Sequence, residues 1–283
     1  MTQRWKIFTV LSIMFLIGFF YRVSMAVAGH DVTVDLGLDA VQLGILAGIF
    51  FYVFAFTQIP LGPLLDRYSA RMVVTIFGLA TTMGAFTFAL APGYRVALIG
   101  RLLLGMGTAS VLMGSLKIFT NWFFPQEFPS VSGFMVAAGN LGNMSATAPL
   151  AMAVTHFGWR ATFLATAVMQ AGITLAVYLV VRDYPSKLAS APAEDRGGAS
   201  FGILHAWRTI LATPAFWFVS LIAFFWYANY MVLLALWGGP YLREAVGLSP
   251  ALAGNTLLCT SVGLILGSLL LGKAIDLLNG SLE

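Results

Sequence analysis

Residues 62–71 read GPLLDRYSAR, and this stretch decides the fold. It places three charged side chains, Asp66, Arg67 and Arg71, between two apolar runs at 41–63 and 72–92. Each run has about 20 residues, which is the length that crosses the hydrocarbon core of a bilayer as a helix. The stretch therefore predicts a short polar turn between two membrane-spanning helices.

The composition of the whole chain agrees with a membrane location. Hydrophobic residues make up 59% of the 283 residues and charged residues only 9%, whereas soluble domains carry about 25% charge. A surface with so few charges must face lipid over most of its area, so we expect the lipid bilayer to be its main partner. The basic residues are spread between apolar runs, so we expect no binding to nucleic acid.

Apolar stretches of membrane-spanning length recur along the chain, and short polar segments separate most of them. Such a pattern predicts an all-α membrane protein in which neighbouring helices are antiparallel. One longer polar segment, 182–213, separates the first six stretches from the last two. The eight predicted helices are 7–29, 41–63, 72–92, 96–120, 130–155, 160–181, 214–240 and 250–272.

The distribution of Lys and Arg predicts which end of the helices faces the cytoplasm. With the N-terminus inside, nine basic residues fall in cytoplasmic segments and three (Arg95, Arg160 and Arg243) fall outside. Positive residues concentrate on the cytoplasmic side of membrane proteins. We therefore expect a multi-pass protein of the bacterial inner membrane with a cytoplasmic N-terminus.

An internal repeat appears when the sequence is shifted by 210 residues. Gly37-Leu38 then falls on Gly247-Leu248, Leu61-Gly62 on Leu271-Gly272, and Asp66 on Asp276. Glycines and an aspartate at helix ends encode backbone geometry, so 214–240 and 250–272 are interpreted as second copies of the first two helices. Parallel repeats of this kind occur in one large class of transporters.

Residues 62–71 resemble the signature between helices 2 and 3 of the major facilitator superfamily, with a Gly, then Asp-Arg four residues later, then a further basic residue. Arg101 to Gly107, RLLLGMG, resembles the family's fourth-helix signature. In the family, the first signature holds the two halves of the transporter together in one gating state. The resemblance thus assigns gating roles to Gly62, Asp66, Arg67, Arg71 and, in the second copy, Asp276. From the residues themselves, Gly62 would allow close helix packing, and Asp66 would pair with a cation or cap the next helix.

The resemblance implies a helical bundle of the major facilitator type. Residues 1–181 would form the six-helix N-terminal half, 182–213 a cytoplasmic linker, and 214–283 the first two helices of the second half. Second copies of helices 3 to 6 would fall beyond Glu283, so we expect a chain that is truncated at its C-terminus.

A closer likeness is to the anion:cation symporter branch of this family. That branch has an Arg in helix 1 and a basic residue before a Trp-Phe-Pro stretch in helix 4, which correspond to Arg22 and Lys117 here. It also carries a Gly-Trp-Arg turn before helix 6, which is 158–160 in this chain. The branch implies coupling to protons or sodium. Tyr21 replaces the acid that commonly precedes the helix 1 Arg, which argues against proton coupling through that position.

Arg22 is the most informative single residue. At 1.5 Å per residue it lies roughly 23 Å from the start of its helix, where a charge is costly unless it faces water or a partner. It would therefore bind an anionic substrate in a cavity or pair with a group inside the bundle. Lys117 would contact the substrate or extend to the membrane surface.

Other polar residues of the predicted helices have two interpretations each. Tyr21, Tyr52 and Asn140 would line the substrate site, although aromatic residues also form belts at the membrane surface and Asn also bridges helices. Arg101 would anchor helix 4 at the interface or pack inside the bundle.

These observations predict a secondary transporter of a small organic anion that works by alternating access. Two alternatives remain open: the same scaffold carrying a neutral or amphiphilic solute or a peptide, and a non-transporting membrane receptor or assembly subunit. The sequence contains no nucleotide-binding, metalloprotease or nucleophile-elbow motif. An enzyme is therefore not expected, and neither is a cofactor or a metal.

Overall fold

The computed structural model describes residues 2–185, 203–231, 233, 241–248 and, beyond these, residues 252, 256, 259, 260, 262, 263, 266 and 267. Within these residues the regular structure is helical and contains no strand. The predicted all-α class is therefore confirmed. The described helices fall into two units, α1–α8 in one and α9–α10 in the other, and each is treated by itself.

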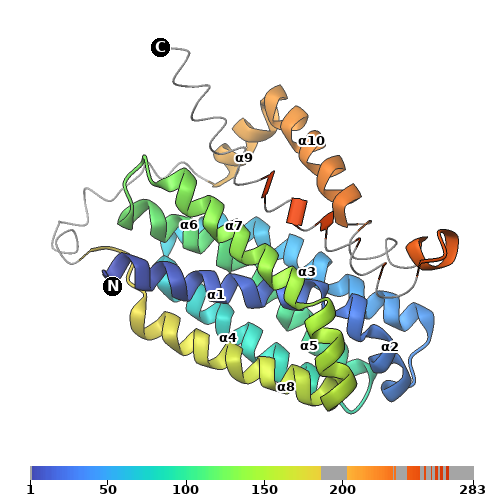
Figure 1. The fold of residues 1–283 in the computed structure, drawn as a ribbon. Helices are drawn as coiled ribbons and strands as arrows, with labels where there is room; N and C mark the ends of the chain where they lie inside the picture. Colours follow the sequence, from blue (N-terminus) through green and yellow to red (C-terminus); the bar gives the residue numbers. More distant parts are fainter. Residues whose placement is uncertain are drawn as a thin grey trace. The chain divides into compact units, whose positions relative to one another are not determined.

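The first unit is a bundle of long helices (Figure 1). In it, α1 packs along α7, and α4 lies between α5 and α8. Its elements are α1 (Gln3–Val23), α2 (Met25–Leu36), α3 (Ala40–Arg67), α4 (Ala70–Ala89), α5 (Tyr94–Thr108), α6 (Ser110–Trp122), α7 (Phe128–Ser145) and α8 (Ala148–Val180).

The second unit begins with the short helix α9 (Ile203–Ala212), followed by α10 (Pro214–Met231) and a five-residue π-helical turn, Tyr241–Ala245. Only part of the predicted 214–240 helix and scattered residues of 250–272 are described. The predicted division of the chain into a half, a linker and a partial second half stays a prediction.

Among the described residues, five helical segments are long and apolar enough to cross a membrane: Gln3–Val23, Ala40–Arg67, Ala70–Ala89, Tyr94–Trp122 and Ala148–Val180. They overlap five of the predicted stretches, although the first ends six residues before the predicted 29 and the last begins twelve residues before the predicted 160. The other predicted stretch of the first unit, 130–155, is divided between α7 and the start of α8. A single helix over 130–155 was therefore wrong, because the chain leaves helical geometry at Ala146 and Thr147.

The 62–71 motif is not a loop throughout. Residues Gly62 to Arg67 belong to α3, which continues through Pro60 and Pro63, so the turn contains only Tyr68 and Ser69. Prolines are tolerated inside membrane helices because neighbouring groups satisfy the carbonyls that they leave without a donor. The predicted helix end at 63 was therefore four residues too early.

Helix ends in this unit are specified locally. Gly37 ends α2 in the left-handed conformation (φ 62°), which glycine adopts without strain. Asp39 then caps α3: its carboxylate accepts from the Gln42 backbone N–H at 2.7 Å, and the Gln42 side chain accepts from the Asp39 N–H at 3.1 Å. Gly158 (φ 77°) makes the turn inside α8, as the sequence predicted for 158–160.

The buried core consists of two apolar clusters at opposite ends of the bundle. One is built around Tyr21, Phe50, Phe88 and Phe163, and the other lies around Leu65, Val74, Phe119 and Val177. Arg22 lies near the first of these apolar clusters, in the last turn of α1.

Candidate functional site

Arg22 lies in the last turn of α1 and is half-buried. Its guanidinium carbon is 5.4 Å from the ring centre of Phe19, 5.5 Å from that of Phe51 and 5.2 Å from that of Phe54. We call these three rings with Arg22 the Arg22 cage. Cation–π contacts stabilise a guanidinium by about 2 kcal/mol or more where water is excluded. The cage thus helps to hold a positive charge inside a membrane-length segment.

The helix carrying Arg22 is interrupted two residues later. Val23 ends α1 and Met25 begins α2, so Ser24 marks a break. The carbonyl oxygen of Tyr21 accepts from Ser24 Oγ at 3.0 Å and from Arg101 Nη1 at 2.8 Å. These donors compensate a carbonyl at the helix end, where intrahelical partners run out.

Tyr21 does not accompany Arg22 on the same side of α1. Its side chain has no exposed surface and its ring stacks on Phe163, with 6.5 Å between ring centres. The structure therefore places the Tyr21 side chain in the core and its carbonyl at the helix break.

Arg101 is completely buried in α5. Besides the Tyr21 carbonyl, it donates from Nε to the Leu46 carbonyl at 3.2 Å, and its guanidinium carbon lies 4.9 Å from the centre of the Phe50 ring. Of its two predicted roles, packing inside the bundle is the one observed. These contacts join α5 to both α1 and α3.

A second polar group, which we call the Asp66 cluster, lies where α3 ends and α4 begins. It consists of the pair Asp66 and Lys117 and, next along the chain, of Ser69 and Arg71 with Asp183. Lys117 Nζ lies 3.1 Å from Asp66 Oδ1 and donates to the Leu65 carbonyl. The structure therefore brings Lys117 to the predicted gating residues.

Asp183 completes this cluster and was not predicted. Its Oδ1 accepts from the Arg71 backbone N–H at 2.8 Å, and its Oδ2 accepts from Ser69 Oγ. Ser69 itself caps α4 by accepting from the Met72 N–H at 3.3 Å. Asp66 therefore takes the predicted pairing role, while Ser69 and Asp183 serve the start of α4. The signal available in the sequence was an acid directly after an apolar stretch, at the same end as Arg71.

The other predicted gating residues have varied surroundings. Arg71 donates from Nη2 to the Tyr178 carbonyl at 2.6 Å. Arg67 is exposed, with its guanidinium 5.7 Å from the Tyr68 ring centre. Asp276 lies outside the described residues.

Within the described part of the first unit, Gly62 does not mediate close packing, because a Cβ added there would meet no atom within 4 Å. The expectation of a close helix approach at this glycine was wrong for this unit. Close approaches occur between α4 and α5 instead: a Cβ at Gly84 would lie 2.7 Å from the Leu104 nitrogen, and one at Gly100 would lie 2.7 Å from the Phe88 nitrogen.

Tyr52 and Asn140 lie in opposite environments. Tyr52 on α3 is 68% exposed. Asn140 on α7 is buried and donates to the Val136 carbonyl of its own helix at 3.2 Å, with the Asn143 amide 3.5 Å from its oxygen. No described contact joins either residue to Arg22.

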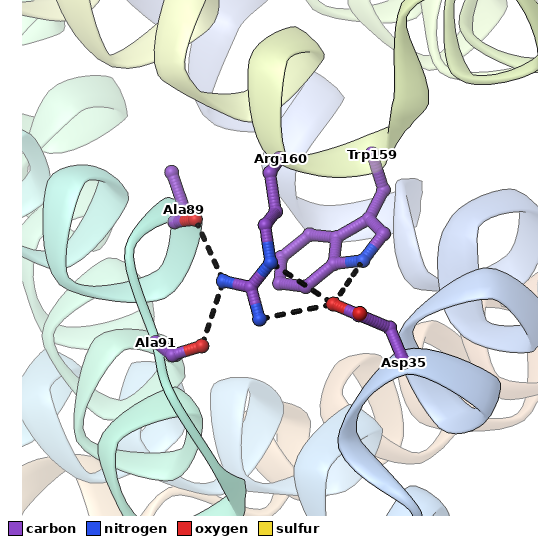
Figure 2. Close-up of polar contacts among 5 residues, drawn as sticks. All are labelled: Asp35, Ala89, Ala91, Trp159 and Arg160. Carbon is purple, nitrogen blue, oxygen red and sulfur yellow. Dashed lines mark hydrogen bonds and ion pairs between the residues drawn. The ribbon is translucent and has the colours of Figure 1, made fainter.

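A third polar group, the Asp35 cluster, lies where the end of α2, the end of α4 and the turn inside α8 meet (Figure 2). Asp35 Oδ2 accepts from Arg160 Nε at 2.9 Å and from the Trp159 indole at 3.1 Å. Arg160 also donates to the carbonyls of Ala89 and Ala91, at 3.3 and 2.7 Å. This cluster ties α2, α8 and the segment between α4 and α5 together, beside an open hollow of about 540 Å³.

The sequence and the fold were compared with those of known proteins. Residues 10–281 match the sequence profile of the Major Facilitator Superfamily. The probable sulfoacetate transporter SauU of Cupriavidus necator is 26% identical over 257 residues, covering 86% of this chain and 58% of that protein. The hexuronate transporter of Bacillus subtilis is 28% identical over 228 residues, covering 76% and 54%.

Not every similar protein is named as a transporter. The membrane sensor protein UhpC of Salmonella typhimurium is 24% identical over 293 residues, covering 93% of this chain and 62% of that protein. Among solved structures, an inward-facing, occupied bacterial homologue of the human lysosomal transporter Spinster superposes with a TM-score of 0.67 at 20% identity, covering 90% of this chain and 57% of that one. This chain spans about half the length of the curated relatives and solved structures that it matches.

Proposed function

Because the chain belongs to the major facilitator superfamily, we propose that it is part of a secondary transporter that moves a small organic anion across the membrane by alternating access. The observation that carries the proposal is the Arg22 cage. It places a cation in a membrane-length helix, held by aromatic rings and beside a helix break.

The chemistry of the cage favours an anionic substrate. A guanidinium carries several N–H donors in one plane, and two of them match the two oxygens of a carboxylate, sulfonate or phosphate. In a segment away from bulk water, such a pair is stronger than at a surface. The names of SauU and of the hexuronate transporter, both referring to acids, support the same class of substrate.

The Asp66 cluster would serve gating in this proposal. Its contacts join α3 to α6 through Asp66 and Lys117, and the start of α4 to α8 and the segment after it through Arg71 and Asp183. Polar contacts of this kind exchange with water at low cost, so they can bias which side of the transporter is open without changing the substrate site. Coupling to a proton or sodium gradient belongs to the proposal, and transport measured under each gradient separately would identify the ion.

One further candidate function has a specific observation in its favour. The likeness to a membrane sensor protein is compatible with a receptor that binds a ligand at the same site without moving it. Binding of an anion without uptake would support the receptor, and uptake would support the transporter.

The test uses the complete polypeptide in liposomes, with sulfoacetate and glucuronate as probes and glucose as the neutral comparison. Arg22→Ala should abolish uptake of the anion, and Arg22→Lys should retain little, because an ammonium does not reproduce a bidentate pair. Arg95→Ala is the matched control, since Arg95 is an exposed arginine at the start of α5. Normal anion uptake by a folded Arg22→Ala variant would contradict the proposal.

A further inference from the structure

Arg101 contacts both of the helices that supply the Arg22 cage, α1 and α3. It contacts α1 at the carbonyl of Tyr21, the residue before Arg22. It contacts α3 at the Leu46 carbonyl and at the ring of Phe50, the residue before Phe51. The two helices that supply the cage are therefore both attached to one buried guanidinium.

The contact with Tyr21 supplies a hydrogen-bond donor to a backbone carbonyl at the helix interruption. At the break after Val23, the Tyr21 carbonyl is served by Ser24 Oγ and by Arg101. A backbone carbonyl without a donor in a membrane environment costs several kcal/mol. An apolar side chain of similar size at position 101 would fill the same volume but would leave this carbonyl with fewer donors.

The geometry of the guanidinium is also specific. Arg101 reaches one carbonyl on α1 with Nη1 and another on α3 with Nε, while its guanidinium carbon lies 4.9 Å from the centre of the Phe50 ring. A planar fork fixes both directions at once, whereas an ammonium group is a point charge that does not. Arg101 therefore constrains the register of α1 against α3.

We propose that Arg101 is a positioning residue for the Arg22 cage: it fixes the α1–α2 break and α3 relative to each other, so that Arg22 is held against Phe51 and Phe54. Arg101 has no exposed surface and acts on the substrate only through Arg22. The inference rests on the proposed role of Arg22 in binding an anion.

The first measurement needs no ligand. Amide hydrogen exchange of the complete protein in detergent or nanodiscs is compared for wild type, Arg101→Lys, Arg101→Gln and Phe50→Leu. We expect exchange in residues 19–28 to become roughly tenfold faster or more in the Arg101 variants. Gln170→Leu is the matched control, because Gln170 is a buried polar residue of α8 that bonds to Thr174 and lies outside the cage. It should leave residues 19–28 unchanged.

The second measurement concerns the anion. In liposomes, the half-saturating concentration of sulfoacetate or glucuronate should rise roughly tenfold in Arg101→Lys, which corresponds to about 1.4 kcal/mol, while the maximal rate changes less. If neither Arg101 variant folds, both measurements are made on Phe50→Leu. We then expect a smaller acceleration of exchange in residues 19–28 and a smaller rise in the half-saturating concentration.

The outcomes separate the two proposals. Unchanged exchange in residues 19–28, or faster exchange spread equally over all helices, would overturn the positioning role. Local exchange that accelerates without any loss of anion affinity would overturn it too. If wild type binds neither probe while the local exchange accelerates, the anion proposal fails, and with it the link to substrate, but the support of the helix break by Arg101 stands.

Discussion

Three basic residues inside the apolar helices of the first unit meet three different environments. Arg22 lies among three phenyl rings, Arg101 is enclosed with two carbonyls and a ring, and Lys117 of α6 pairs with Asp66 at the end of α3. Each environment limits what the side chain does. Arg101 supports the backbone and Lys117 joins helix ends, so the proposed anion site depends on Arg22.

The pair between Lys117 and Asp66 gives a prediction at the residue scale. Asp66→Asn and Lys117→Met should change the maximal transport rate two- to tenfold, or about 0.4–1.4 kcal/mol in activation free energy, with little change in the half-saturating concentration. The reason is that the pair lies at the end of α3, away from the Arg22 cage. Initial rates in liposomes over a range of glucuronate concentrations would measure both quantities.

The effect on stability should be small. The Lys117 side chain is 36% exposed and the Asp66 side chain 84% exposed, and ion pairs at such positions contribute about 0–1 kcal/mol. Glu127→Gln serves as the control, because its pair with Arg4 joins α1 to the start of α7 and its side chains are 32% (Arg4) and 36% (Glu127) exposed. A loss of affinity with the maximal rate intact would show that the gating assignment of the cluster is wrong.

At the scale of elements, the breaks matter as much as the helices. The sequence predicted where apolar stretches begin and end, because their length and polarity are local properties. It did not predict the helix interruptions at Ser24 and Ala109, where the backbone angles stay helical, or the break at Ala146–Thr147. Beside the first of these, the Tyr21 carbonyl accepts from Arg101, a residue remote in sequence that could not be inferred from the stretch itself.

The same reasoning explains which site residues were predictable. A lone charge in an apolar run identified Arg22 and Lys117 as unusual, and a family motif identified Asp66 and Arg71. Their partners, such as Asp183 and the rings of α3, come from other helices. Sequence alone therefore located the charged residues but did not determine which contacts they make.

The Asp35 cluster gives a prediction for an element junction. Asp35→Asn removes the charge that faces Arg160 and Trp159 (Figure 2). Because the Arg160 and Asp35 side chains are 39% and 45% exposed, we expect a loss of only about 1 kcal/mol in stability. The melting temperature in detergent should fall by a few degrees, while the half-saturating concentration for the anion stays the same.

The control for this variant is Asp31→Asn. Asp31 lies one turn earlier on α2, is exposed and borders the same hollow, so its replacement tests a general effect of removing an acid there. Equal changes in melting temperature for the two variants would show that the contacts of Asp35 with α8 contribute nothing specific.

At the scale of the whole molecule, the structure shows which segments share an end of the first unit. The start of α1 meets the end of α8 and the start of α7, through Gln3 with the Val180 carbonyl and Arg4 with Glu127. The turn between α3 and α4 meets Asp183 at the same end. Asp35, Ala91 and Arg160 meet at the other end.

This grouping sharpens the predicted orientation in the membrane. The end that contains the start of α1 carries Arg4, Lys6, Arg67, Arg71 and Arg182, whereas the end with the Asp35 cluster carries Arg95 and Arg160 among the residues that the structure describes. Since positive residues near helix ends stay on the cytoplasmic side, the first of these ends should face the cytoplasm. Reporter fusions after Arg71 and near Lys187 should then report a cytoplasmic location, and a fusion near Asp35 a periplasmic one. The fusion near Lys187 is decisive, because it follows α8: a periplasmic signal there would require an odd number of crossings before it and would contradict six helices in the first half.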